Sequence, residues 1–96
     1  MNTFLQLLKK EKLPLPEVEY RFCGRRWRFD YAYPDRKIAI EQEGAVWVSG
    51  RHTRGSGFVK DMEKYNQAAI LGWRLLRYTP EQILGQAVDD LKIILK

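Results

Sequence analysis

Hydrophobic and polar positions follow a helical period at the start of the chain and a strand period soon afterwards. Residues 3–11 carry apolar side chains at helical spacing behind a capping Asn2 or Thr3, and Pro14 and Pro16 end this first helix. The alternation that follows predicts three strands in succession: Glu19–Phe22, Arg26–Tyr33 and Lys37–Glu43.

The second half of the chain returns to the helical period. The clearest helix is Phe58–Leu71, and Gly72 stops it. A fourth strand is predicted at Trp73–Tyr78, and Thr79 caps a last helix that runs from Pro80 to about Leu95. The helix Phe58–Leu71 is amphipathic, with a predicted apolar face of Phe58, Met62, Tyr65 and Ala69 and a polar face of Lys60, Lys64 and Gln67.

This order of elements predicts one α/β domain over residues 1–96. The first three strands can form an antiparallel meander. The helix at 58–71 is long enough to cross over and return the chain in a parallel fourth strand, through a right-handed connection. We therefore expect a small mixed sheet of four strands that is flanked by helices.

Composition excludes several classes of protein. Apolar residues make up 45% of the chain, so a packed globule is expected rather than disorder. No apolar run approaches the roughly 20 residues of a membrane span, and the first ten residues are too polar for a secretory signal. The single cysteine, Cys23, excludes an internal disulfide. A cytoplasmic protein that does not bind membranes is the resulting expectation.

The charge balance points to a polyanionic partner. The chain has 17 Lys and Arg against 12 Asp and Glu, a net charge of +5. Four arginines fall within residues 21–28, and Trp27 and Trp47 lie among the basic positions. Basic side chains interleaved with aromatic ones are typical of nucleic-acid surfaces. A solvated basic face without a partner is the alternative.

Three acidic residues stand on two neighbouring predicted strands. Asp30 belongs to the second strand, and Glu41 and Glu43 share one face of the third because side chains alternate along a strand. If these strands pair as a hairpin, the three carboxylates converge and repel one another. A divalent cation relieves that repulsion, and hard cations such as Mg²⁺ prefer carboxylate oxygen. A metal site in a basic protein suggests chemistry on a phosphate backbone.

The order of elements and the placement of these acids resemble the PD-(D/E)XK, or restriction-endonuclease-like, superfamily with its αβββαβ core. The similarity covers about residues 17–85 and is greatest to small nucleases near the very-short-patch-repair type, with similar stand-alone domains in phages and prophages. It rests on four stretches of the chain: Phe29-Asp30, Ile40-Glu41-Gln42-Glu43-Gly44, the helix from Asp61 to Asn66, and the strand from Gly72 to Tyr78.

The resemblance implies a metal site. Asp30 matches the motif aspartate and Glu41 the motif (D/E), so both would bind Mg²⁺, with Mn²⁺ as a substitute. The backbone carbonyl of Gln42 would complete the coordination. The motif lysine falls at position 43, where this chain has Glu43.

Two compensations for the missing lysine stay open. Glu43 would be a third metal ligand or the base that orients water. Alternatively, Lys64 or Lys60 on the following helix would supply the positive charge, since they lie one turn apart on one face. If neither holds, the domain would bind DNA without cutting it.

A long glycine-rich loop is predicted at residues 44–57. Its His52 is either a general base, a leaving-group donor or a phosphate contact, or an exposed histidine without a role. Arg51 and Arg54 suit phosphate oxygens through their guanidinium forks. The predicted contacts with nucleic acid are Arg25, Arg26, Arg51, Arg54 and Lys60.

These observations lead to one hypothesis and one alternative. The hypothesis is a Mg²⁺-dependent endodeoxyribonuclease, encoded by a phage or prophage, that hydrolyses phosphodiester bonds of DNA. A homodimer would allow such a small domain to cut both strands. The alternative is a non-catalytic DNA-binding module with a degenerate nuclease site.

Overall fold

The computed structural model describes residues 2–43 and 56–96, and it describes the side chains of all of these except 56–58. The predicted order of helices and strands is confirmed. The elements are α1 (Thr3–Lys10), β1 (Glu17–Arg21), β2 (Arg28–Tyr33), β3 (Ile38–Gln42), α2 (Ser56–Ile70), β4 (Arg74–Tyr78), the short 3₁₀ helix η2 (Gln82–Leu84) and α3 (Gln86–Ile94).

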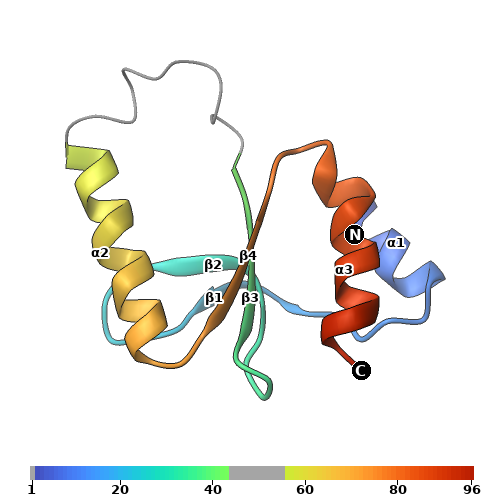
Figure 1. Ribbon diagram of the computed structural model, residues 1–96, viewed down its shortest axis with the longest axis horizontal. Coiled ribbons are helices and arrows are strands. Elements are labelled where there is room, and N and C mark those ends of the chain that lie inside the picture. The colour runs from blue at the N-terminus through green and yellow to red at the C-terminus, as the bar shows by residue number, and fades with distance from the viewer. Residues whose placement is uncertain (1, 44–55) are drawn as a thin grey trace.

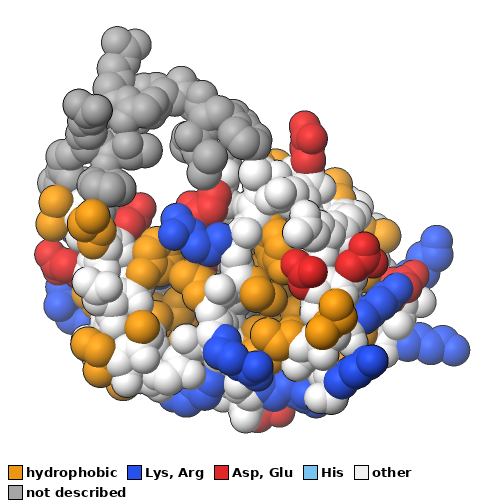
Figure 2. All heavy atoms as spheres, viewed as in Figure 1, with side chains coloured by type: hydrophobic (Ala, Val, Ile, Leu, Met, Phe, Trp, Pro, Cys, Tyr) orange, Lys and Arg blue, Asp and Glu red, His pale blue; other side chains and the backbone are white. Residues whose placement is uncertain are grey.

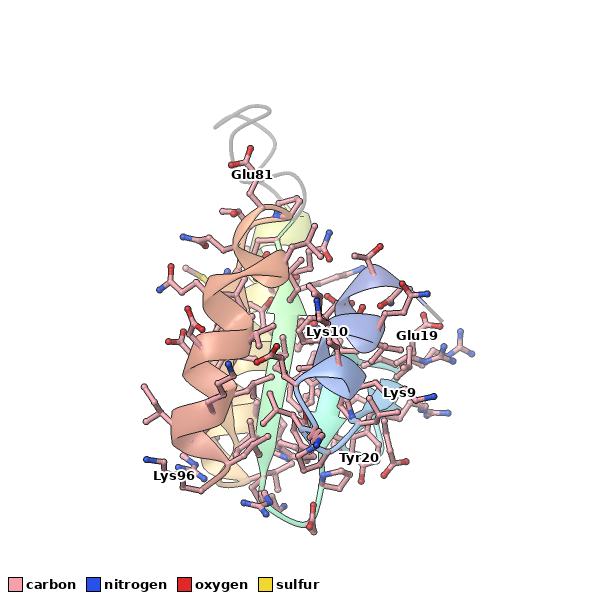
Figure 3. All side chains as sticks on the ribbon, turned by 90° about the vertical axis from the view of Figure 1, so that its right-hand side faces the viewer. Lys9, Lys10, Glu19, Tyr20, Glu81 and Lys96 are labelled. Atoms are coloured by element: carbon pink, nitrogen blue, oxygen red, sulfur yellow. The ribbon has the colours of Figure 1, made fainter. Side chains whose placement is uncertain are left out.

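The four strands form one mixed sheet in the order β1-β2-β3-β4. β1, β2 and β3 are antiparallel neighbours, and β4 pairs with β3 in parallel. α2 lies between β3 and β4 along the chain, as the expected crossover requires. Figure 1 shows α2 on one side of the sheet and α1 with α3 on the other. Figure 3 shows α1 and α3 side by side on that second face.

Each face of the sheet buries its own apolar cluster. Ile38 and Ile40 of β3 pack under α1 and α3, together with Leu8 and Leu91. The intervening Ala39 belongs to the second cluster, which includes Ala68 of α2. The alternation along β3 thus follows the strand period and directs the next odd-numbered residue, position 41, towards α2.

Local signals at two helix ends are confirmed. The Asn2 side chain caps α1 by accepting a hydrogen bond of 2.8 Å from the backbone nitrogen of Leu5. Gly72 follows α2 with a φ of 89°, a left-handed conformation that glycine adopts without steric cost. These ends fix where α2 stops and β4 begins.

The prediction of one continuous last helix is wrong. Gly85 has φ −146° and ψ −77°, and it separates η2 from α3. Glycine has a low helix propensity, so a break at this position costs less than elsewhere. Thr79 still caps the segment: its Oγ1 accepts from the backbone nitrogen of Gln82 at 3.1 Å, and Gln82 Oε1 accepts from the Thr79 nitrogen at 3.0 Å.

The predicted faces of α2 are also wrong. Met62 is 50% exposed and Ala69 is exposed, whereas Ala68 is buried. Lys64, four residues before Ala68, therefore lies on the inward side of the helix. The helix begins at Ser56, two residues before the predicted start. Among the described residues, no helix has both the length and the apolar character needed to cross a bilayer.

Candidate functional site

The candidate site lies where β2 and β3 separate. Backbone pairing between the two strands ends at Tyr31 opposite Ile40. Beyond that pair, side-chain carboxylates accept the backbone hydrogen bonds. The nitrogen of Asp30 donates to Glu41 Oε2 at 2.9 Å, and the nitrogen of Gln42 donates to Asp30 Oδ2 at 2.8 Å. Each carboxylate is therefore held in place by the strand that carries the other one.

Glu41 is the only charged or polar residue that is buried among the described residues, with 5% of its surface exposed. Its Oε1 accepts a hydrogen bond from Nζ of Lys64, and the side chains of this ion pair are 6% and 13% exposed. A buried carboxylate is costly unless it is paired and hydrogen-bonded. The Lys64 ammonium from α2 and the backbone of β2 supply those partners.

Glu43 points to the same face as Glu41 but has a different partner. Arg77 Nε donates to Glu43 Oε1 at 2.8 Å. The Tyr65 hydroxyl lies between the two glutamates, 3.2 Å from Glu43 Oε1 and 3.3 Å from Glu41 Oε1. A hydroxyl has one proton to donate, so the two carboxylates share it. The arrangement joins α2, β3 and β4 in one polar network.

The expected convergence of three carboxylates does not occur among the described residues. In that part of the chain, no group of three or more His, Cys, Asp or Glu side chains is placed to hold a metal ion. Glu43 instead forms an ion pair with Arg77. Asp30 and Glu41 remain as a pair that two reciprocal hydrogen bonds bring together.

Burial and charge act in opposite directions on Glu41. Burial raises the pKa of Glu41, while the hydrogen bonds from Lys64 and from the Asp30 nitrogen lower it, and the net pKa is raised. Burial also raises the pKa of Tyr65, and the charges of Glu41 and Glu43 raise it further. Tyr65 therefore stays protonated and serves as a hydrogen-bond donor.

Replacing Lys64 with Met is expected to destabilise the fold at neutral pH and much less at acid pH. Without Lys64 the folded-state pKa of Glu41 rises further above its unfolded value. Below the unfolded pKa, Glu41 is protonated in both states and the loss is small. The loss grows as pH rises from the folded-state pKa of Glu41 in the parent to its higher folded-state pKa in the variant. Above that pH the loss is about 3 kcal/mol, the scale for breaking a buried ion pair.

Urea unfolding of the parent chain and of Lys64→Met from about pH 4 to about pH 8 measures this difference. Lys60→Met is the matched control, because Lys60 is exposed one turn earlier on α2. Its loss should stay within about 0.5 kcal/mol at every pH. A Lys64→Met loss that does not change with pH would contradict the assigned ion pair.

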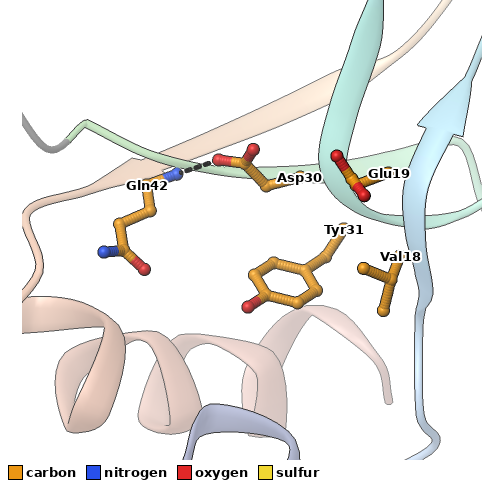
Figure 4. A pocket seen from close by; sticks show the side chains of 5 residues that line it. All are labelled: Val18, Glu19, Asp30, Tyr31 and Gln42. Atoms are coloured by element: carbon orange, nitrogen blue, oxygen red, sulfur yellow. Dashed lines mark hydrogen bonds between the residues drawn. The ribbon is translucent and has the colours of Figure 1, made fainter. Parts of the chain in front are cut away.

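A pocket of about 340 Å³ opens beside Asp30. Figure 4 shows Asp30 at its edge, joined to the backbone of Gln42, with the Glu19 and Tyr31 side chains around the same hollow. Glu19 lies between the register pairs Val18–Tyr31 and Tyr20–Phe29, and it has a φ of 50°, which is uncommon for a residue other than glycine. Asp30 is thus accessible from the pocket, whereas Glu41 lies on the α2 face.

Three of the five predicted basic contacts, Arg25, Arg26 and Lys60, lie among the described residues. The Arg25 guanidinium stacks 4.2 Å from the Trp27 ring and lies 3.8 Å from Glu63 of α2. Arg26 and Lys60 are exposed. Figure 2 shows basic side chains scattered among acidic and hydrophobic ones on the face it presents. The predicted loop at 44–57 lies almost entirely outside the described residues, and so do its site residues His52, Arg51 and Arg54.

Sequence reasoning missed two residues of this network. Tyr65 was predicted to lie on the apolar face of the helix, but its hydroxyl contacts both glutamates. Arg77 was predicted only as a residue of the fourth strand, without a role in the site, but it is the register partner of Glu41 across β3 and β4. The parallel register that identifies Arg77 is not encoded in any short motif, although Lys64 could be found from helical spacing.

Comparison with known proteins gives few relatives. No family model and no solved structure matches the chain. Two uncharacterized proteins of Mycobacterium tuberculosis, from strains CDC 1551 / Oshkosh and ATCC 25618 / H37Rv, are each 33% identical over 67 residues. The match covers 67% of this chain and 23% of each relative. The chain therefore spans about a quarter of the length of the curated relatives that it matches.

Proposed function

We propose that this chain is a Mg²⁺-dependent endonuclease that hydrolyses phosphodiester bonds of DNA. The observation that carries the proposal is the pair of reciprocal hydrogen bonds between Asp30 and the Glu41-Gln42 segment, with Lys64 on Glu41. Two fixed carboxylates and one ammonium at the separation of two strands agree with the nuclease core that the sequence resembles. That restriction-endonuclease-like core is part of the proposal.

The donor set fits a hard divalent cation. Magnesium is commonly bound through one or two carboxylates, and waters and substrate phosphate complete its shell. Asp30 Oδ2 and Glu41 Oε2 are each oriented by a backbone N–H, the kind of outer contact that positions metal ligands. Asp30 Oδ1 has no hydrogen-bond partner within the described residues. The carbonyl of Gln42 is the proposed third donor.

The charge of the network also favours a cation. Asp30, Glu41 and Glu43 carry three negative charges, and Lys64 and Arg77 carry two positive ones. The site is thus one unit negative within a chain of net charge +5. When bound, Mg²⁺ supplies neutralisation of charge at the scissile phosphate and a lower pKa for the attacking water.

Lys64 is proposed to replace the lysine that is missing at position 43. Its Nζ contacts the carboxylate of Glu41, so a phosphate bound beside Glu41 comes within reach of the ammonium. The lysine would donate to the oxygen on which negative charge develops during in-line attack. Tyr65 links Glu41 and Glu43 through its shared hydroxyl and so restricts the movement of both carboxylates.

The alternative function, a DNA-binding module without turnover, is favoured by a separate observation. Both oxygens of Glu41 already accept hydrogen bonds from protein groups, and Glu43 is taken by Arg77. In the alternative function these hydrogen bonds occupy the carboxylate oxygens, and the site binds no metal ion. The module would bind DNA and leave it intact under every metal condition.

Incubation of the chain with labelled duplex, single-stranded and four-way-junction DNA separates the two functions. The endonuclease should cut at least one of these substrates in Mg²⁺ or Mn²⁺ and none in EDTA, because the attack depends on the cation. Binding to DNA with no cutting of any substrate would establish the alternative. Neither binding nor cutting would contradict both.

A further inference from the structure

Arg77 is fixed beside the candidate site by two contacts. Its Nε donates to Glu43 Oε1, and its guanidinium carbon lies 4.6 Å from the centre of the Tyr65 ring. The parallel register places Arg77 next to Glu41 on the neighbouring strand, about 5 Å away through the backbone. This side chain is therefore both oriented and adjacent to the proposed metal ligand.

The guanidinium of Arg77 has N–H donors that its contact with Glu43 does not use. A guanidinium carries five N–H groups, and the contact with Glu43 uses the one on Nε. The two Nη groups make no hydrogen bond to any of the described residues. The Arg77 side chain is 51% exposed, whereas that of its partner Glu43 is 23% exposed. The unused fork can therefore meet a ligand from solvent.

We infer that Arg77 is a phosphate-binding residue that holds the DNA backbone next to the cleaved bond through its Nη groups. A planar guanidinium fork matches the spacing of two phosphate oxygens. Because Glu43 and Tyr65 already hold the fork, binding orders fewer rotamers than it would for a free surface arginine. Glu43 then has a positioning role that explains a carboxylate at this position. The inference rests on the proposed function for its choice of ligand.

Lys37 and Trp73 show by contrast why other cation–ring pairs are not candidates. Lys37 Nζ lies 5.2 Å from the Trp73 ring and donates to the Leu71 carbonyl at 3.3 Å. That contact joins the residue before β3 to the residue after α2. It lies at the opposite end of β3 from Glu41. Arg77 alone among the described cation–ring contacts combines a fixed guanidinium with the register position of Glu41.

Binding of a labelled duplex, followed by anisotropy in EDTA over a range of salt concentrations, tests the inference. Arg77→Gln should bind at least roughly tenfold more weakly, the loss of one charge-assisted hydrogen bond. The slope of log affinity against log salt should become shallower by about 0.9, one phosphate contact. Arg74→Gln removes the same charge from the other end of β4 and should leave the slope unchanged.

Equal changes in the two variants, or none in either, would overturn the inference. Should Arg77→Gln fail to fold, Arg77→Lys provides a second test, because it keeps the charge and removes the guanidinium. Weaker DNA binding with an unchanged salt slope supports the guanidinium–phosphate contact. Parent-like affinity overturns the inference. Binding in EDTA does not depend on cleavage. A parent that cuts DNA while Arg77→Gln binds like the parent refutes this inference alone, whereas a parent that neither binds nor cuts DNA refutes the proposed function.

Discussion

Asp30→Asn and Glu41→Gln are each expected to abolish Mg²⁺-dependent cleavage and to leave DNA affinity unchanged or higher. Both changes keep the shape of the side chain and an oxygen that can accept the backbone hydrogen bond at this position. They remove the negative charge that a hard cation requires. Removing that charge also reduces repulsion of phosphate, so binding should not weaken. Because Glu41→Gln also breaks the buried ion pair with Lys64, both variants are compared under conditions where circular dichroism shows that they are folded, so that the loss reports catalysis.

Single-turnover cleavage in Mg²⁺ and binding in EDTA measure the two quantities separately. Asp89→Asn is the matched control, since Asp89 is an exposed acid on α3 whose side chain makes no hydrogen bond with the described residues of the site. It should cleave like the parent. Full cleavage by either Asp30→Asn or Glu41→Gln would show that these carboxylates do not form the metal site.

Lys64→Met is expected to reduce the cleavage rate by about two to four orders of magnitude, the scale for one transition-state donor or proton-transfer group. The reason is the position of Lys64 Nζ on the carboxylate of Glu41, where the chain has no lysine at position 43. Methionine keeps most of the length and volume of lysine and removes the ammonium. DNA affinity should change much less than the rate.

The rate is compared at a pH and temperature where circular dichroism shows that Lys64→Met is folded, because loss of the buried ion pair also lowers stability. Lys60→Met provides the control on the same helix: Lys60 is exposed and belongs to the basic contacts rather than to the carboxylate network. Parent-like rates in both variants would remove lysine from the mechanism and leave Glu43 as the remaining ligand or base.

Local patterns predicted the fold well because each depends on a few neighbouring residues. The capping Asn2 and the left-handed Gly72 are signals of backbone chemistry that act within one turn. Alternation in β3 placed Glu41 and Glu43 on one face, and Tyr65 contacts both. The face of α2 that packs on the sheet was harder to predict, since Met62 and Ala69 are apolar yet lie outside the core.

Features that depend on tertiary register could not be read from the chain. Arg77 meets Glu43 only because β4 pairs in parallel with β3 at that register. The alternation along β2 also fails once: Phe29 packs in the cluster under α2, whereas Tyr31 packs in the cluster under α1 and α3. That change of face, next to the left-handed Glu19, has no signature in a period of two.

Nicking of closed-circular DNA by the parent chain and by Glu41→Gln, purified in the same way, tests the central claim most directly. A circle has no ends, so its relaxation reports endonucleolytic cleavage. The account predicts that the parent relaxes the circle in Mg²⁺ and not in EDTA, and that Glu41→Gln leaves it closed in both. A circle that relaxes equally with Glu41→Gln would contradict the proposed endonuclease, and so would a circle that stays closed with the parent in Mg²⁺ when none of the labelled duplex, single-stranded and junction substrates is cut.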